Sequence, residues 1–303
     1  MAVVVPVYNA ASVLPWSVPA ILAQSGVSQW VFVDDGSTDD SATRLEALIG
    51  SHPSASVRRI RDNRGRAHAR NRGIEAVAEA DVAVFFDADV APPPGTVEAF
   101  VRALSHTEAV AAVAPIHHLD PPNDLYGAYV RRGTRGLGAT EEGTSVPWRY
   151  FVTAACAVTL EALREAGGFD ERIRYGEDLA LAVCLDAAYG PGALRSISIP
   201  VPMRDTSTLD RALADVHQFG RELRRLAREH PNALRVAGLP RWFPTAARWY
   251  PRPLGRIAAS VGHRLGAHLP VPMQASVARW MLGETLMQSF AASRSAHTVS
   301  KAG

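Results

Sequence analysis

The chain has 303 residues, of which 47% are hydrophobic and 20% are charged, and its formal net charge is only +2. This is the composition of an ordinary globular protein that can bury a sizeable core in one large domain or two smaller ones. Because basic and acidic residues are interspersed through the first two thirds, the charge pattern argues against a nucleic acid partner.

The start of the chain and its cysteines bear on the compartment. The first residues, AVVVPVY, form an apolar strand pattern and lack the basic start and apolar stretch of a signal peptide. No segment approaches the roughly 18 uninterrupted apolar residues of a transmembrane helix. Cys156 and Cys184 lack metal-type spacing, which favours buried thiols in a reducing compartment. We therefore expect a cytoplasmic protein, with peripheral contact to a membrane left open.

Short β-branched runs alternate with helical patterns in the first half of the chain. The expected strands are 2–7, 30–34, 57–60, 82–86 and 109–115, and the expected helices are 11–24, 39–49, 65–78 and 95–105. This alternation predicts βαβ units and an α/β fold with a mainly parallel sheet. Right-handed crossovers then place the carboxyl ends of the strands on one rim.

Polar residues follow the expected strands. The first strand ends in Pro6, Tyr8 and Asn9, the second runs into the acidic and hydroxyl residues of 34–39, and a polar stretch, 63–73, opens the third helix. Turn and cap chemistry explains any one of these segments by itself. Together on one rim they predict a single binding cleft.

The segment 82–90, VAVFFDADV, ends an apolar run in two carboxylates, Asp87 and Asp89. Such a run suits a strand buried on both faces of a parallel sheet, and ligands bind at the carboxyl ends of such strands. If the extended conformation continues, both side chains point the same way with Cα atoms about 6.6 Å apart. Two neighbouring like charges favour a divalent cation, whereas a turn before the following prolines is the structural alternative.

Five motifs occur in order along the chain: PVYNA, VDDGSTD, NRGRAHARNRG, FDADV and GGFDERIRYGEDLAL. With these motifs the chain resembles the family 2 glycosyltransferases of the GT-A fold over residues 1–202. The resemblance implies a Rossmann-like, mainly parallel sheet flanked by helices. It also implies an inverting transferase that uses a nucleotide sugar and a divalent cation.

The resemblance assigns roles on the donor side. Asp35 matches the carboxylate that reads the donor base, and the backbone around Pro6 and Tyr8 forms the floor of that pocket. Arg70 matches a basic residue near the base or the diphosphate. In the DxD motif Asp87 lies near the ribose and Asp89 is a metal ligand. Oxygen ligands suit magnesium or manganese, and UDP is the weakly favoured donor nucleotide.

The resemblance also assigns the acceptor side. Asp178 matches the catalytic base, which takes the proton of the attacking hydroxyl, and Glu177 is a neighbour that shapes the acceptor pocket or orients the base. The structural alternative is two acidic residues in the first turn of a helix, where the macrodipole favours them. A long connector, 116–146, precedes Trp148 and Tyr150, which either stack on the acceptor or belong to the core.

Two departures from the family pattern affect the expected contacts. The family's TGA-type turn reads Thr153, Ala154 and Ala155 here, which removes a glycine. Where many members place a histidine after the last strand, this chain has PVPMRDTST, so Arg204 is expected to contact the phosphates instead. The metal would then have one fewer protein ligand.

The expected domains are a catalytic domain, 1–204, divided into a nucleotide half, 1–115, and an acceptor half, 116–204, and a helical C-terminal region, 205–303. Residues 210–228 form a basic amphipathic pattern, and 241–256 mix Trp, Tyr, Arg and Pro. These patterns fit a membrane interface, a lipid-linked acceptor, a helical cap or a homodimer contact. The QxxRW motif of polysaccharide synthases is only partly present near Gln218, which favours transfer of a single sugar to an acceptor hydroxyl. The rival hypotheses are a non-catalytic nucleotide-binding or partner module and a nucleotidyltransferase.

Overall fold

The structure is a computed structural model that describes residues 1–105, 108–131, 141–204, 208–229 and 271–292. The chain divides into two compact units. Unit 1 comprises Met1–Leu119 and Thr134–Arg204, and unit 2 comprises Asp120–Gly133 and Asp205–Gly303. The polar-aromatic segment 241–256 and the tail from 293 lie outside the described residues.

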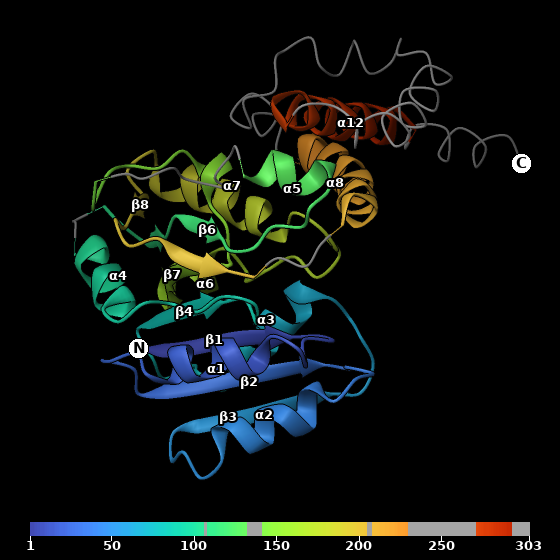
Figure 1. Ribbon diagram of the computed structural model, residues 1–303. Helices are drawn as coiled ribbons and strands as arrows, with labels where there is room; N and C mark the ends of the chain where they lie inside the picture. The colour runs from blue at the N-terminus through green and yellow to red at the C-terminus, as the bar shows by residue number, and fades with distance from the viewer. Residues whose placement is uncertain (106–107, 132–140, 205–207, 230–270, 293–303) are drawn as a thin grey trace, which may run out of the picture. The chain divides into compact units, whose positions relative to one another are not determined.

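Unit 1 is built on a seven-stranded sheet in the order β3-β2-β1-β4-β7-β5-β8 (Figure 1). Its strands are β1 (Ala2–Val7), β2 (Gln29–Asp35), β3 (Ala55–Ile60), β4 (Val82–Phe86), β5 (Ala111–Val113), β7 (Ala155–Thr159) and β8 (Leu194–Ser196). Neighbouring strands pair in parallel except that β7 is antiparallel to both β4 and β5. The mainly parallel sheet expected from the sequence is therefore confirmed. A second, two-stranded parallel sheet joins β6 (Ile116–His118) to β9 (Val201–Met203).

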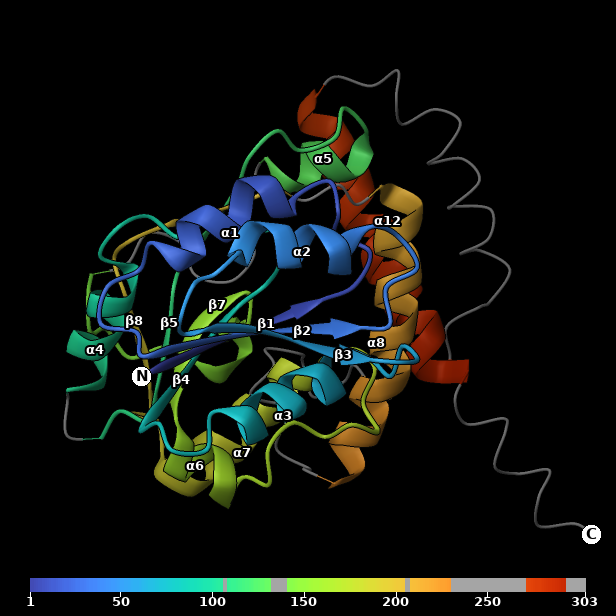
Figure 2. The ribbon, with the colours of Figure 1, turned by 90° about the horizontal axis from the view of Figure 1, so that it is seen from below.

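Helices cover both faces of the large sheet. They are α1 (Leu14–Leu22), α2 (Ser41–Ile49), α3 (Arg66–Ala76), α4 (Thr96–Leu104), α6 (Leu160–Glu165) and α7 (Glu177–Tyr189), with a short 3₁₀ turn at Trp148–Tyr150. Figure 2 shows α1 and α2 on one face and α3, α6 and α7 on the opposite face. The main core includes alternate residues of β1 and β2 together with apolar residues of α1 and α4, so burial of these side chains holds the sheet between its helices.

Unit 2 is helical in its described part. It contains α5 (Leu125–Val130), α8 (Leu209–Glu229) and α12 (Val271–Ala292), which share an apolar cluster. Asp124 caps α5 by accepting a hydrogen bond from the Gly127 N–H at 2.8 Å, and it accepts a second from the Leu209 N–H at 3.1 Å. None of the described helices combines the length and apolar character needed to cross a bilayer.

The observed elements differ from the expected ones mainly in the part of the chain that follows β5. All nine expected strands and helices are present, with ends shifted by up to three residues. The connector expected over 116–146 is wrong as a continuous loop, because it contains β6 and α5. Strand β6 pairs with β9, far along the chain, so no local pattern announces it.

A close approach of α3 to β1 sets the position of the most polar helix of unit 1. Gly73 lies in the second half of α3, and a Cβ atom built there would be 2.2 Å from Cγ1 of Val4. Because this distance is far inside van der Waals contact, only glycine lets the helix lie this close to the strand.

We expect Gly73→Ala to lower the free energy of unfolding by about 1–3 kcal/mol through overpacking. Thermal unfolding followed by circular dichroism measures the effect. Gly283→Ala is the matched control, because Gly283 also lies in a helix but a Cβ there would meet no atom within 4 Å. The control should be neutral or stabilising. Equal midpoints for the two variants would contradict the packing argument.

Candidate functional site

The loops that follow β1 and β2 are fastened to each other at the carboxyl edge of the sheet. Asn9, with φ of +48°, donates its backbone N–H to Oγ of Ser37 at 3.0 Å, and its side-chain oxygen accepts the N–H of Thr38 at 2.8 Å. Ser41 Oγ accepts the Ala10 N–H at 2.8 Å. The PVYNA and VDDGSTD motifs therefore form one hydrogen-bonded corner beside Asp35.

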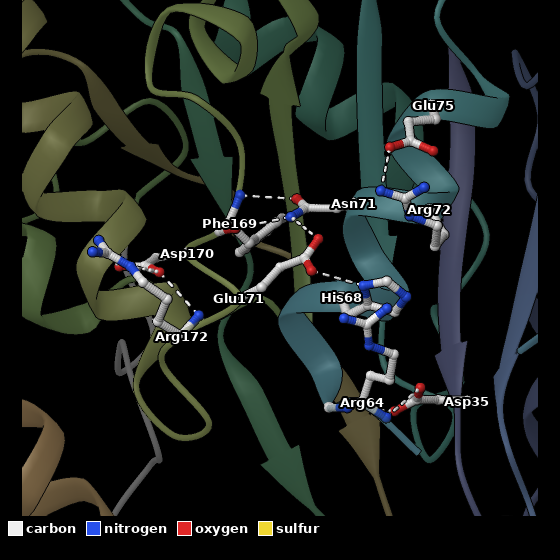
Figure 3. Close-up of polar contacts among 11 residues, drawn as sticks. Asp35, Arg64, His68, Asn71, Arg72, Glu75, Phe169, Asp170, Glu171 and Arg172 are labelled. Atoms are coloured by element: carbon white, nitrogen blue, oxygen red, sulfur yellow. Dashed lines mark hydrogen bonds and ion pairs between the residues drawn. The ribbon is translucent and has the colours of Figure 1, made fainter. Parts of the chain in front are cut away.

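Asp35 joins this corner to the start of α3. Its two carboxylate oxygens accept backbone N–H groups from Arg64 at 3.0 Å and Gly65 at 2.7 Å (Figure 3). Burial raises the pKa of Asp35 above its ordinary value, although these two N–H groups act in the opposite direction. Pro6 is half-buried in β1, and Tyr8 is 47% exposed next to the corner.

The two aspartates of FDADV stand at the end of β4, but not in an extended strand. The strand ends at Phe86, and residues 88–89 form a turn in which the Val90 N–H donates to the Asp87 carbonyl at 3.3 Å. The spacing expected from extended geometry is therefore wrong, because the turn interrupts the alternation of side chains. The Asp87 N–H donates to the carbonyl of Ala154 at 3.0 Å, so the family's TGA-type position lies against the first aspartate.

Arg70 connects the end of β4 with the start of α7. Its guanidinium donates to Oδ1 of Asp87 at 2.8 Å and to Oε1 of Glu177 at 2.7 Å, and its side chain is only 1% exposed. Burial lowers the pKa of Arg70, but the charges of Asp87 and Glu177 outweigh this effect, so the pKa lies above its ordinary value. Arg70 therefore faces carboxylates of the protein, and both of its terminal nitrogens have protein partners.

The start of α7 carries the remaining acidic residues. Gly176, with φ of +89°, precedes the helix, and Glu177 and Asp178 occupy its first turn, as the structural alternative for them requires. Glu177 is buried, whereas Asp178 is partly exposed and accepts the N–H of Leu179 at 2.8 Å. Both readings of this pair, helix-end stabilisation and catalysis, are thus compatible with the same geometry.

Three further residues expected at the site have clear surroundings. Arg204 directly follows β9, donates its backbone N–H to the Asp89 carbonyl at 2.9 Å, and lies over the ring of Trp16 with Cζ 4.6 Å from the centroid. Trp148 is 2% exposed, as expected of a core aromatic rather than of a stacking surface. Tyr150, two residues later, is exposed.

The described residues contain no group of three or more His, Cys, Asp or Glu side chains arranged to enclose a metal ion. Magnesium, however, is commonly bound by one or two carboxylates together with substrate phosphates. The partly buried carboxylates of Asp87 and Asp89 at the end of β4 fit a site of that kind. Cys156 is buried, whereas Cys184 is only half-buried, and neither takes part in a disulfide.

Several contacts of α3 were not anticipated. Asn71 binds the backbone of Phe169, and His68 lies 2.8 Å from the carboxylate of Glu171. The partners are separated by about a hundred positions, so the only signal was that both segments belong to motifs of unusual polarity. Figure 3 shows these residues between α3 and the segment before α7.

We expect Arg70→Ala to lower the free energy of unfolding by about 3–5 kcal/mol, because it leaves buried Glu177 without its counter-ion. Chemical denaturation measures the loss. Arg59→Ala is the control: Arg59 pairs with Glu46 at 2.8 Å, but the two side chains are 53% and 55% exposed, so that pair is worth at most about 1 kcal/mol. Similar losses for both variants would show that Arg70 is not a structural bridge.

Comparison with curated proteins relates the chain to sugar transferases. The pre-mycofactocin glycosyltransferase of Mycobacterium tuberculosis (strain H37Rv) is 31% identical over 186 residues, which are 59% of this chain and 37% of that protein. The minor teichoic acid biosynthesis protein GgaA of Bacillus subtilis is 25% identical over 185 residues, covering 58% of this chain and 41% of that protein. The chain thus matches well under half the length of either relative.

Comparison with solved structures supports the fold. The mannosyltransferase PcManGT from Pyrobaculum calidifontis, in complex with GDP-Man and Mn²⁺, aligns with a TM-score of 0.64 at 19% identity, covering 96% of this chain and 85% of that one. Residues 1–349 of S. aureus TarS align with a TM-score of 0.60 at 15% identity, covering 98% and 91%. The GT-A fold expected from the motifs is confirmed.

The profile described as glycosyl transferase family 2 matches residues 2–162, which is more than half of the chain and spans the first four motifs. The rim of polar strand ends, the bridge through Arg70 and the acidic start of α7 all lie in unit 1, most of which this match covers. The motifs, the family match and the fold agree, and the chain belongs to glycosyltransferase family 2.

Proposed function

We propose that the protein transfers one sugar from a nucleoside diphosphate sugar to an acceptor hydroxyl, with inversion at the sugar carbon and with a divalent cation. The observation that carries this proposal is the bridge through Arg70. By contacting Asp87 and Glu177 together, it brings the carboxylate end of β4 next to the helix start that bears Asp178. One cluster then holds a donor-side and an acceptor-side carboxylate, as a displacement reaction requires.

The corner around Asp35 is the proposed site of the donor base. Asp35 is a carboxylate on the rim, and a carboxylate oxygen can accept a second hydrogen bond besides the one that it receives from the backbone. Uracil and guanine both present ring N–H donors that suit such an acceptor. Neighbours of this fold were solved with UDP-GlcNAc and with GDP-Man, which supports these two nucleotide classes as the first candidates. Pro6 and exposed Tyr8 would form the floor below the base.

The diphosphate would lie between the end of β4 and Arg204, the residue that follows β9. Asp89, with Asp87 nearby, would hold a manganese or magnesium ion whose charge stabilises the departing nucleoside diphosphate. Arg204 would add a cation there, since its backbone is bonded to Asp89 and its guanidinium is supported by Trp16. Arg70 would not contact the diphosphate itself; it would fix the orientation of the Asp87 carboxylate.

Asp178 is the proposed general base. It is partly exposed at the first turn of α7, so an acceptor hydroxyl can approach it, and a carboxylate there can take the proton as the hydroxyl attacks. Glu177 is buried and paired with Arg70, which suits it to orienting the helix start rather than to receiving the proton. A base on the face of the sugar opposite the leaving group produces inversion.

We expect the native chain to release nucleoside diphosphate from one donor in a screen of UDP-, GDP- and dTDP-sugars with manganese or magnesium. Slow hydrolysis of the donor provides a signal even without the true acceptor. Asp89→Ala and chelation should each abolish release. Asp178→Asn should lower transfer to an added acceptor by about 100-fold or more, because the general base is lost.

Asp186→Asn is the control for the Asp178 variant, since Asp186 lies on the same helix two turns further on and should leave turnover unchanged. If the chain bound a nucleotide without turning it over, and if Asp178→Asn left that binding unchanged, the protein would be a non-catalytic nucleotide-binding module and not an enzyme. No release and no calorimetric binding of any nucleotide would overturn the donor site as well.

A further inference from the structure

The side-chain amide of Asn71 pairs with the backbone of the segment that precedes α7, as the backbone of a neighbouring β-strand would. Its Nδ2 donates to the carbonyl of Phe169 at 2.8 Å, and its Oδ1 accepts the N–H of the same residue at 2.9 Å. Nδ2 also donates to Oε1 of Glu171 at 3.0 Å. One amide thus satisfies both main-chain groups of a residue 98 positions away and fixes that residue in two directions.

Glu171 strengthens the same attachment. Its second oxygen, Oε2, lies 2.8 Å from Nδ1 of buried His68, which stands one helical turn before Asn71. Burial raises the pKa of Glu171, but the hydrogen bonds from Asn71 and His68 outweigh it, so the pKa lies below its ordinary value. Figure 3 shows the carboxylate held between these two side chains of α3.

Two glycines make this approach possible. Gly167 and Gly168 have φ of +77° and +75°, so the chain turns through the left-handed region just before Phe169. A Cβ at position 168 would lie 2.9 Å from Oδ1 of Asn71. The close fit indicates that the backbone is shaped to receive this amide.

The segment from Phe169 to Asp178 is also held near its far end, and a residue between the two ends is buried. Glu177 is bonded to Arg70, Ile173 is buried, and Tyr175 lies 5.8 Å from the guanidinium of Arg66. The ring of Phe169 packs edge-on against Phe85 at 5.4 Å between centroids. The segment is therefore fastened along α3, by Asn71 and His68 at its start and by Arg66 and Arg70 toward its end.

We propose that Asn71 is a positioning residue, which sets the place of the Asp178 carboxylate through the segment 169–178. The inference rests on the proposed function, in which Asp178 is the base. The hydrogen bonds of Asn71 go to Phe169 and Glu171, both in the segment that leads to Asp178, so it acts on the acceptor side of the reaction and not on donor binding. A displacement of the base by about 1 Å is enough to slow a transfer by about 100-fold.

The test compares Asn71→Ala and Asn71→Asp with the native chain. Asn71→Asp keeps the shape and the acceptor for the Phe169 N–H, but it replaces the donor with a second oxygen that faces the Phe169 carbonyl and the Glu171 carboxylate. Both variants should raise hydrogen–deuterium exchange in 169–178 and lower kcat for transfer by about tenfold or more. The donor KM and the donor affinity by calorimetry should stay within twofold of native values.

Two further variants serve as a control and as an independent check on the partner residue. Arg72→Ala is the matched control: Arg72 is the next residue of α3, pairs with Glu75 on the same helix at 2.6 Å, and should change neither exchange nor kcat. Glu171→Ala removes a residue whose side chain is 34% exposed, so the fold should survive. It should produce a smaller change in the same direction as Asn71→Ala.

The outcomes separate this inference from the proposed function. A native chain that does not turn over any donor would refute the proposed function, and it would also refute a catalytic role for the contacts of Asn71. A native chain with turnover, but with Asn71 and Glu171 variants that keep native kcat while exchange rises, would overturn the inference alone. A fall in donor affinity that matches the fall in kcat would also overturn it, because Asn71 would then support the donor site.

Discussion

The arrangement of the site depends on one buried cation between two carboxylates. Arg70 is almost fully buried, and a buried guanidinium is tolerated only when its charge is compensated. Asp87 and Glu177 compensate the charge and accept hydrogen bonds from the two terminal nitrogens, one from the end of β4 and the other from the start of α7. Because removal of Arg70 would leave two neighbouring carboxylates without the cation that they share, the pairing holds these two segments together.

Helix α3 supplies most of the side chains and backbone groups that hold the rim together. Asp35 accepts N–H groups just before its first turn, Arg70 faces β4 and α7, and Asn71 and His68 hold the segment before α7. The contact of Gly73 with Val4 sets the distance from the helix to the sheet on which these contacts rest. The polar motif that covers residues 63–73 therefore makes many contacts inside the protein, and it supports the strand ends that carry Asp35 and Asp87.

The first half of the fold follows closely from the sequence, because apolar runs and helical periods there reflect local rules. The place of β7 between β4 and β5, the pairing of β6 with β9 and the helix α5 do not, since these depend on partners distant in the chain. The site shows the same division. Asp35, Asp87 and Asp178 stand out as polar residues at the ends of predicted elements, whereas the partners of Arg70 and Asn71 emerge only from the folded chain. The turn after Phe86 also changes the expected geometry of the two aspartates.

A double-mutant cycle measures the coupling of Asp87 to Glu177 through Arg70. Asp87→Asn, Glu177→Gln and the double variant are compared with the native chain by the free energy of unfolding. Two residues that share one buried counter-ion should show an interaction energy of about 0.5–3 kcal/mol. Additivity within about 0.5 kcal/mol would mean that the two carboxylates act independently and that the bridge does not organise the site.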